Sequence, residues 1–328
     1  MISRAIKDGV VKGLRTAAML LTIMIPIYLG VTLLRHTDFF AWLSERIAPA
    51  MQIFGLPGEA VIPLVAGAFA DEYAVVAAMS GFPFTMAHIT IIAMVTLAFH
   101  SMPVETVITK KIGMPAMRIA LFRIGLAVFT GLVVAYLAAL FLGGDLPDFS
   151  FSSHRVDPSL QSSSDALAAA GERVFNAGPD VILPEMGWGV LKTVINLLRV
   201  LIPLMIGIEL MLRYRVIEAM AKKLGFFCRL IGIGQEALLP LLVGLFLGVT
   251  YGAGAIAEMN RIRPLSPRNM AILGVFLFSC HGIIETTYLF AIAGGSAVFV
   301  SLVRLAIAIG ITAAAARLIK DRKEGISV

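Results

Sequence analysis

Two short polar motifs inside otherwise apolar sequence carry the residue types best suited to chemistry. In each motif a polar side chain lies four residues before a glutamate, Ser101 before Glu105 and His281 before Glu285. Residues four apart share one face of a helix, so each motif would present a carboxylate beside a hydroxyl or an imidazole. Such groups can hydrogen-bond a polar solute, and a buried glutamate or histidine can carry a coupled proton because burial shifts its pKa. The solute contacts predicted from these motifs are Ser101, Glu105, Thr106, His281, Glu285 and Thr286.

A purely structural role for the two glutamates is an open alternative. Glu105 could pair with Arg123, and Glu285 could pair with Arg304, further along the chain. The charges within each half of the chain would then neutralise each other without contacting a solute.

A transition-metal site is a second alternative, because Cys280, His281 and Glu285 stand close together in the sequence. A histidine and a glutamate four residues apart are weak grounds for such a site, and the first motif has Ser101 where His281 stands. We therefore expect no bound metal.

An acidic pair falls within an apolar stretch that Pro and Gly residues interrupt. Asp71, Glu72 and Tyr73 stand in the middle of the stretch 59–81, and a second interrupted stretch has Thr250 at the matching depth. An interrupted helix in a membrane frees backbone groups that must face protein or a watery cavity. We predict solute contacts at these four residues. The alternative is that the first stretch reaches water and its acids are simply solvated.

Ionisable groups at membrane depth are expensive if they face lipid, at roughly 2.5–3.5 kcal/mol each near the bilayer centre. Six such residues are predicted here: Asp71, Glu72, Glu105, Arg123, Glu285 and Arg304. They must therefore face the protein interior, one another or a watery cavity.

The composition requires elements that lie in a membrane. Of the 328 residues, 59% are apolar and 15% are charged, whereas soluble domains carry about 25% charged residues; the mean hydropathy is +0.90. A net charge of +6 does not indicate nucleic-acid binding, because the basic residues cluster between apolar runs. No Walker A, Gly-x-Ser-x-Gly or His-Glu-x-x-His pattern occurs. We expect an integral membrane protein that is not an enzyme and has no cofactor other than a coupling Na⁺ or H⁺.

Apolar runs of about 20 residues predict membrane-spanning helices. The six predicted spans are 16–35, 85–107, 118–142, 191–212, 269–293 and 296–317. The two interrupted stretches, 59–81 and 236–257, predict re-entrant hairpins. Two amphipathic stretches, 37–54 and 214–231, predict helices at the membrane interface.

The two halves of the chain resemble each other. Residues 55–67 align with 232–244, and the same offset of 177 places Pro26 on Pro203; further along, Glu105 aligns with Glu285 and Arg123 with Arg304 at offsets of 180 and 181. We predict a first repeat at 1–142, a polar linker at 143–189 and a second repeat at 190–328. Three spans plus one hairpin in each repeat would place the second repeat upside down, which is the inverted-repeat plan of many secondary transporters.

The distribution of Lys and Arg predicts the orientation. Most of the 27 basic residues lie on one side of the membrane if neither hairpin crosses it, and the basic side is cytoplasmic. We expect a multi-pass protein of the bacterial cytoplasmic membrane, with both termini in the cytoplasm and the linker outside. Its expected partners are the lipid bilayer, a small solute and, as one option, further copies of the chain.

The repeated Pro-Leu-x-x-Gly sequence (Pro63 to Gly67 and Pro240 to Gly244), followed in each half by a helix containing Glu-Thr, resembles the Gate or nucleoside-recognition domain. Spore maturation proteins A and B, the membrane part of ferrous-iron permeases and the core of concentrative nucleoside transporters share that domain. The resemblance covers about 13–142 and 188–318 as two copies. The chain lacks the extra scaffold helices of the nucleoside carriers and the GTPase domain of the iron permeases.

The resemblance implies a secondary transporter or permease for a small polar, nucleoside-like solute that works by alternating access. Two alternatives remain: a membrane assembly or sensory component that transports nothing, and a permease for divalent metals.

Overall fold

The computed structural model describes residues 2–34, 37–80, 82–111, 114–143 and 179–319. Throughout these ranges the chain forms helices and short connections, with no β-strand. This confirms the predicted all-α class. A helix suits such apolar sequence in a membrane because it satisfies its own backbone hydrogen bonds. Residues 144–178 of the predicted linker lie outside the described residues, and its last part, 179–189, is helical and begins α9 (Pro179–Arg213).

Seventeen helical elements are described, falling before and after the linker. Those before it are α1 (Ile2–Leu34), α2 (Asp38–Gln52), η1 (Gly58–Ala60), α3 (Val61–Phe69), α4 (Glu72–Met79), α5 (Met86–Phe99), α6 (Met102–Lys111) and α7 (Ala116–Phe141). Those after it are α9 (Pro179–Arg213), α10 (Val216–Lys223), α11 (Gly225–Ile231), η2 (Gln235–Ala237), α12 (Leu238–Ile262), α13 (Pro267–Ser279), α14 (Ile283–Ile292), η3 (Phe299–Val303) and α15 (Arg304–Leu318).

Five helical segments are long and apolar enough to cross a membrane. They are 86–110, 116–141, 187–213, 267–292 and 299–318, which confirms five of the six predicted spans. A further pair, Gly225–Ile231 and Gln235–Val249, passes the same test together but is bent by 111°. The remaining predicted span, 16–35, falls in α1, which is helical to Leu34.

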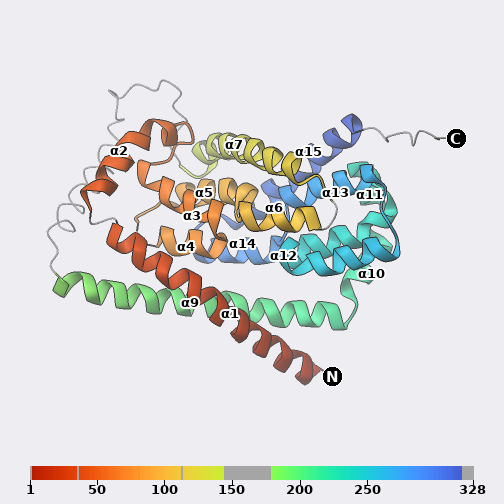
Figure 1. The fold of residues 1–328 in the computed structure, drawn as a ribbon, viewed down its shortest axis with the longest axis horizontal. Helices are drawn as coiled ribbons and strands as arrows, with labels where there is room; N and C mark the ends of the chain where they lie inside the picture. The colour runs from red at the N-terminus through yellow and green to blue at the C-terminus, as the bar shows by residue number, and fades with distance from the viewer. Residues whose placement is uncertain (1, 35–36, 81, 112–113, 144–178, 320–328) are drawn as a thin grey trace.

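The helices α1 and α9 pack against each other along one edge of the molecule (Figure 1). They are antiparallel, since Gly9 of α1 lies against Ile206 and Gly13 against Ile202. A Cβ at Gly9 would lie 2.6 Å from the Cα of Ile206, so the two backbones approach this closely only because α1 has a glycine here. Small residues serve the same purpose at other helix contacts in membranes.

Four helices are broken in the middle of the molecule. The chain leaves helical geometry at Ala70 and Asp71 between α3 and α4, and at Gly248 within α12, where φ is +78°. It does so again between α5 and α6 at Ser101, with φ +48°, and between α13 and α14 at Gly282, with φ +58°. The breaks in the two interrupted stretches therefore occur near where the Pro and Gly pattern predicted them.

The two halves share their apolar cores. Met114 and Ile119 pack into the core formed mainly by α12 and α13, while Phe290 and Phe299 pack into the core formed mainly by α5 and α7. In addition, α4 contacts α14 and α6 contacts α12. The broken helices of one half thus lie directly against those of the other.

Candidate functional site

The breaks at Ser101 and Gly282 are each held by a backbone hydrogen bond to the interrupted stretch of the same half. The N–H of Ser101 donates to the carbonyl oxygen of Gly67 at 2.8 Å, and the N–H of Gly282 donates to that of Gly244 at 3.3 Å. The Ser101 hydroxyl also donates to the carbonyl of Ala70. A helix end leaves backbone groups without partners, so these bonds explain how the breaks are held in place.

Two histidines meet at the breaks. His100 ends α5 and His281 follows α13, and both side chains are almost fully buried. Their Nε2 atoms lie 3.3 Å apart. Each Nδ1 faces a carbonyl oxygen one turn earlier in its own helix, that of Thr96 at 3.2 Å for His100 and that of Leu277 at 2.8 Å for His281.

Glu105 lies between the histidines and Arg123. Its Oε1 is 3.6 Å from Nε2 of His100 and 3.4 Å from Nε2 of His281, and its Oε2 is 2.7 Å from Nη1 of Arg123. Both Glu105 and Arg123 are only 1% exposed. The ion pair weighed from the sequence is therefore present in the first half, and the same carboxylate also faces the second half through His281.

Arginines 123 and 304 have equivalent settings. The Nε of Arg123 donates to the carbonyl of Ala98, and the Nε of Arg304 donates to that of Ser279, which is 181 positions further on. Where Arg123 meets a carboxylate, Arg304 donates from Nη1 to the Thr286 hydroxyl at 3.0 Å. The structure thus equates Glu105 with Thr286 rather than with Glu285.

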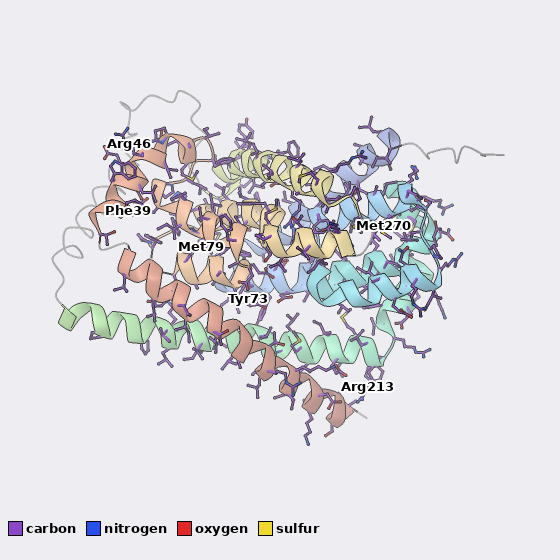
Figure 2. All side chains as sticks on the ribbon, viewed as in Figure 1. Phe39, Arg46, Tyr73, Met79, Arg213 and Met270 are labelled. Carbon is purple, nitrogen blue, oxygen red and sulfur yellow. The ribbon has the colours of Figure 1, made fainter. Side chains whose placement is uncertain are left out.

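Glu285 bonds across the halves. The Tyr73 hydroxyl, on α4, donates to Oε1 of Glu285, on α14; Figure 2 shows Tyr73 at the level of these helices, near the middle of the molecule. The sequence alignment of Glu105 with Glu285 was one residue out of register, because apolar sequence gives little to fix it. The proposed Glu285–Arg304 pair is consequently replaced by the bond from Tyr73.

Glu72 and Asp71 differ in role although they are adjacent. Glu72 points at the histidines, with Oε2 3.5 Å from Nε2 of His100. Asp71 caps α4 by accepting the N–H of Ala74 at 2.8 Å, which is a common task for Asp at a helix start. The cap gives Asp71 a structural reason to be there.

The hydroxyl groups have mostly local partners. Thr106 donates to the carbonyl of Met102 in its own helix at 2.5 Å, and Thr286 donates to that of Gly282 at 3.0 Å. The backbone of Thr250 lies in α12 just after the break at Gly248, but its side chain lies outside the described residues.

His100 is the residue that sequence reasoning left out of the predicted contacts. The offset of 181 that relates Arg123 to Arg304 also relates His100 to His281. Applying that one offset to the whole motif would have paired the histidines and placed Ser101 opposite Gly282, where both have positive φ.

Comparison with known proteins gives two findings. The model of a family called Gate, described as nucleoside recognition, matches residues 17–115 and 194–296. A membrane protein of Bacillus subtilis, YvoD, is 29% identical over 319 residues, which cover 96% of this chain and 95% of that protein. No solved structure matches.

Proposed function

Because the chain belongs to the Gate family of membrane proteins, we propose that it is a secondary transporter or permease for a small polar, nucleoside-like solute. The observation that carries this proposal is the buried polar cluster where four broken helices meet, two from each half. Carboxylates, imidazoles and guanidinium groups at such a depth are costly and typically mark a solute or ion path.

We propose that the two halves form an inverted repeat, which would allow movement by alternating access. The antiparallel packing of α1 and α9, and the equivalent bonds made by Arg123 and Arg304, fit two related halves that face opposite ways. We assign these halves to 1–142 and 190–328, with 143–189 as an extracytoplasmic linker. Rocking of one half against the other would expose the cluster to each side in turn.

The hydrogen bond between Tyr73 and Glu285 would have to break when the two halves rock apart. It joins α4 of the first half to α14 of the second, so opening the cluster separates its two partners. The residues that we propose to contact the solute, once opening frees them, are Asp71, Glu72, Tyr73, Ser101, Glu105, Thr106, Thr250, His281, Glu285 and Thr286. A Na⁺ or H⁺ gradient would drive the cycle.

Uptake into proteoliposomes tests the proposal. The purified protein should accumulate labelled nucleosides when a Na⁺ or H⁺ gradient is imposed. Glu285→Gln should lower the initial rate of uptake roughly 10-fold or more. The variant loses the carboxylate that we propose the solute contacts, and a hydrogen bond to a charged group contributes about 1.5–3 kcal/mol. Glu258→Gln is the matched control, because Glu258 lies exposed on α12 and pairs with Arg261 on its own helix.

Absence of uptake for nucleosides and a wider panel of polar solutes would overturn the transport proposal. The protein would then be better described as a membrane assembly or sensory component. In that case Glu285→Gln should lower expression or thermal stability instead of a transport rate.

A further inference from the structure

Three potential metal ligands converge between the two halves. Nε2 of His100, Nε2 of His281 and Oε1 of Glu105 lie 3.3, 3.4 and 3.6 Å from one another. All three side chains are buried. They come from the end of α5, the start of α6 and the break after α13, so the group exists only because the chain folds both halves together.

The tautomers of the two histidines follow from their other ring nitrogens. A carbonyl oxygen can only accept, so the carbonyls of Thr96 and Leu277 require a hydrogen on Nδ1 of His100 and His281 respectively. In the neutral ring Nε2 then carries a lone pair. Two such lone pairs and a carboxylate oxygen face one another, an arrangement that a metal cation or a proton on one Nε2 would stabilise.

The spacing fits a tetrahedral ion. Zinc with bonds of about 2.0–2.1 Å to nitrogen and oxygen holds its ligand atoms about 3.3–3.4 Å apart. The three distances in the structure, 3.3, 3.4 and 3.6 Å, are close to that value. Oε2 of Glu72 lies 3.5 Å from Nε2 of His100 but outside the three-ligand group, so a water would complete the coordination.

The surroundings support the same conclusion. Ligating histidines usually donate their second N–H to a carbonyl or carboxylate, as both do here. Oε2 of Glu105 pairs with Nη1 of Arg123 at 2.7 Å, which leaves Oε1 of the same carboxylate facing the two histidines. Two imidazoles and a carboxylate suit zinc-like transition metals better than Mg²⁺ or Ca²⁺.

We propose that His100, Glu105 and His281 bind one divalent transition-metal ion. The site differs from the Cys280–His281–Glu285 set weighed from the sequence, since it takes His100 and Glu105 in place of Cys280 and Glu285. The inference rests on the coordination geometry and stands whether or not the protein transports a solute.

Metal analysis of the full-length protein in detergent tests this, using a purification tag that contains no histidine. After treatment with a chelator and addition of Zn²⁺, the protein should retain one equivalent through gel filtration. His100→Gln and His281→Gln should each weaken Zn²⁺ binding by more than roughly 100-fold, the upper end of what losing a second-shell partner costs. Co²⁺ should give the strong visible absorption of a tetrahedral site.

His88→Gln and Cys280→Ala are the matched controls. His88 is a buried residue of the capping box at the start of α5, and Cys280 adjoins His281 without belonging to the three ligands. Both variants should bind Zn²⁺ like the unchanged protein. The proposal is overturned if no stoichiometric Zn²⁺ is retained by protein that elutes as a folded species, or if the two His→Gln variants bind as well as the controls.

Discussion

At the scale of single residues, the two buried arginines bind the backbone in the same way but face different side chains. Each donates its Nε to a carbonyl 25 residues earlier in the chain. Arg123 then faces a carboxylate and Arg304 a hydroxyl. Removing the arginine therefore leaves a carboxylate without its direct partner in the first case, and a hydroxyl and a carbonyl without theirs in the second.

Arg123→Gln should destabilise the protein more than Arg304→Gln. Removing one partner of a buried ion pair costs about 3–5 kcal/mol, whereas an unsatisfied neutral group costs about 1–3 kcal/mol. Thermal unfolding of the two variants side by side in one detergent measures the difference. Adding Glu105→Gln to Arg123→Gln should recover part of the loss, because the uncompensated charge is then gone. Equal losses for the two single variants would contradict this account.

At the scale of helices, much of the architecture could be predicted from the sequence. Length and hydropathy alone locate five spans, since about 20 apolar residues match the bilayer thickness. Pro and Gly locate the interrupted stretches because they weaken helices. The register between the halves could not be fixed in the same way. Exchanging one Leu or Val for another leaves the pattern unchanged, so Glu105 was aligned with Glu285 and His100 was missed.

The packing of α1 on α9 can be tested at one glycine. Gly9→Ala should lower stability by about 1–3 kcal/mol, the usual cost of overpacking, because its Cβ would meet the backbone of Ile206. Gly30→Ala, on the same helix with nothing within 4 Å of the added atom, should be neutral or stabilising by up to about 1 kcal/mol. Thermal unfolding in detergent compares them. A Gly9→Ala variant as stable as Gly30→Ala would show that the two helices do not pack this closely.

At the scale of the whole molecule, the inverted arrangement can be tested by its orientation. A single cysteine at Ser163, in a background without Cys228 and Cys280, should react with an impermeant reagent in intact cells. One at Ser266, which caps α13, should react only after the membrane is opened. These outcomes follow if the side of the protein that is rich in Lys and Arg faces the cytoplasm, as the positive-inside rule predicts. Labelling of Ser266 from outside would rule out the proposed orientation, and with it the opposed halves.

Glu105 in the first half and Thr286 in the second occupy equivalent positions, and this difference bears on the direction that the proposed transporter faces at rest. If both halves were identical and faced opposite ways, the inside and the outside of the membrane would be indistinguishable to the protein. A carboxylate on one side of the shared core and a hydroxyl on the other remove that equivalence. In the proposed alternating-access cycle, the energies of the inward-open and outward-open forms then need not be equal. A difference of a few atoms at the centre would give such a transporter a preferred resting side.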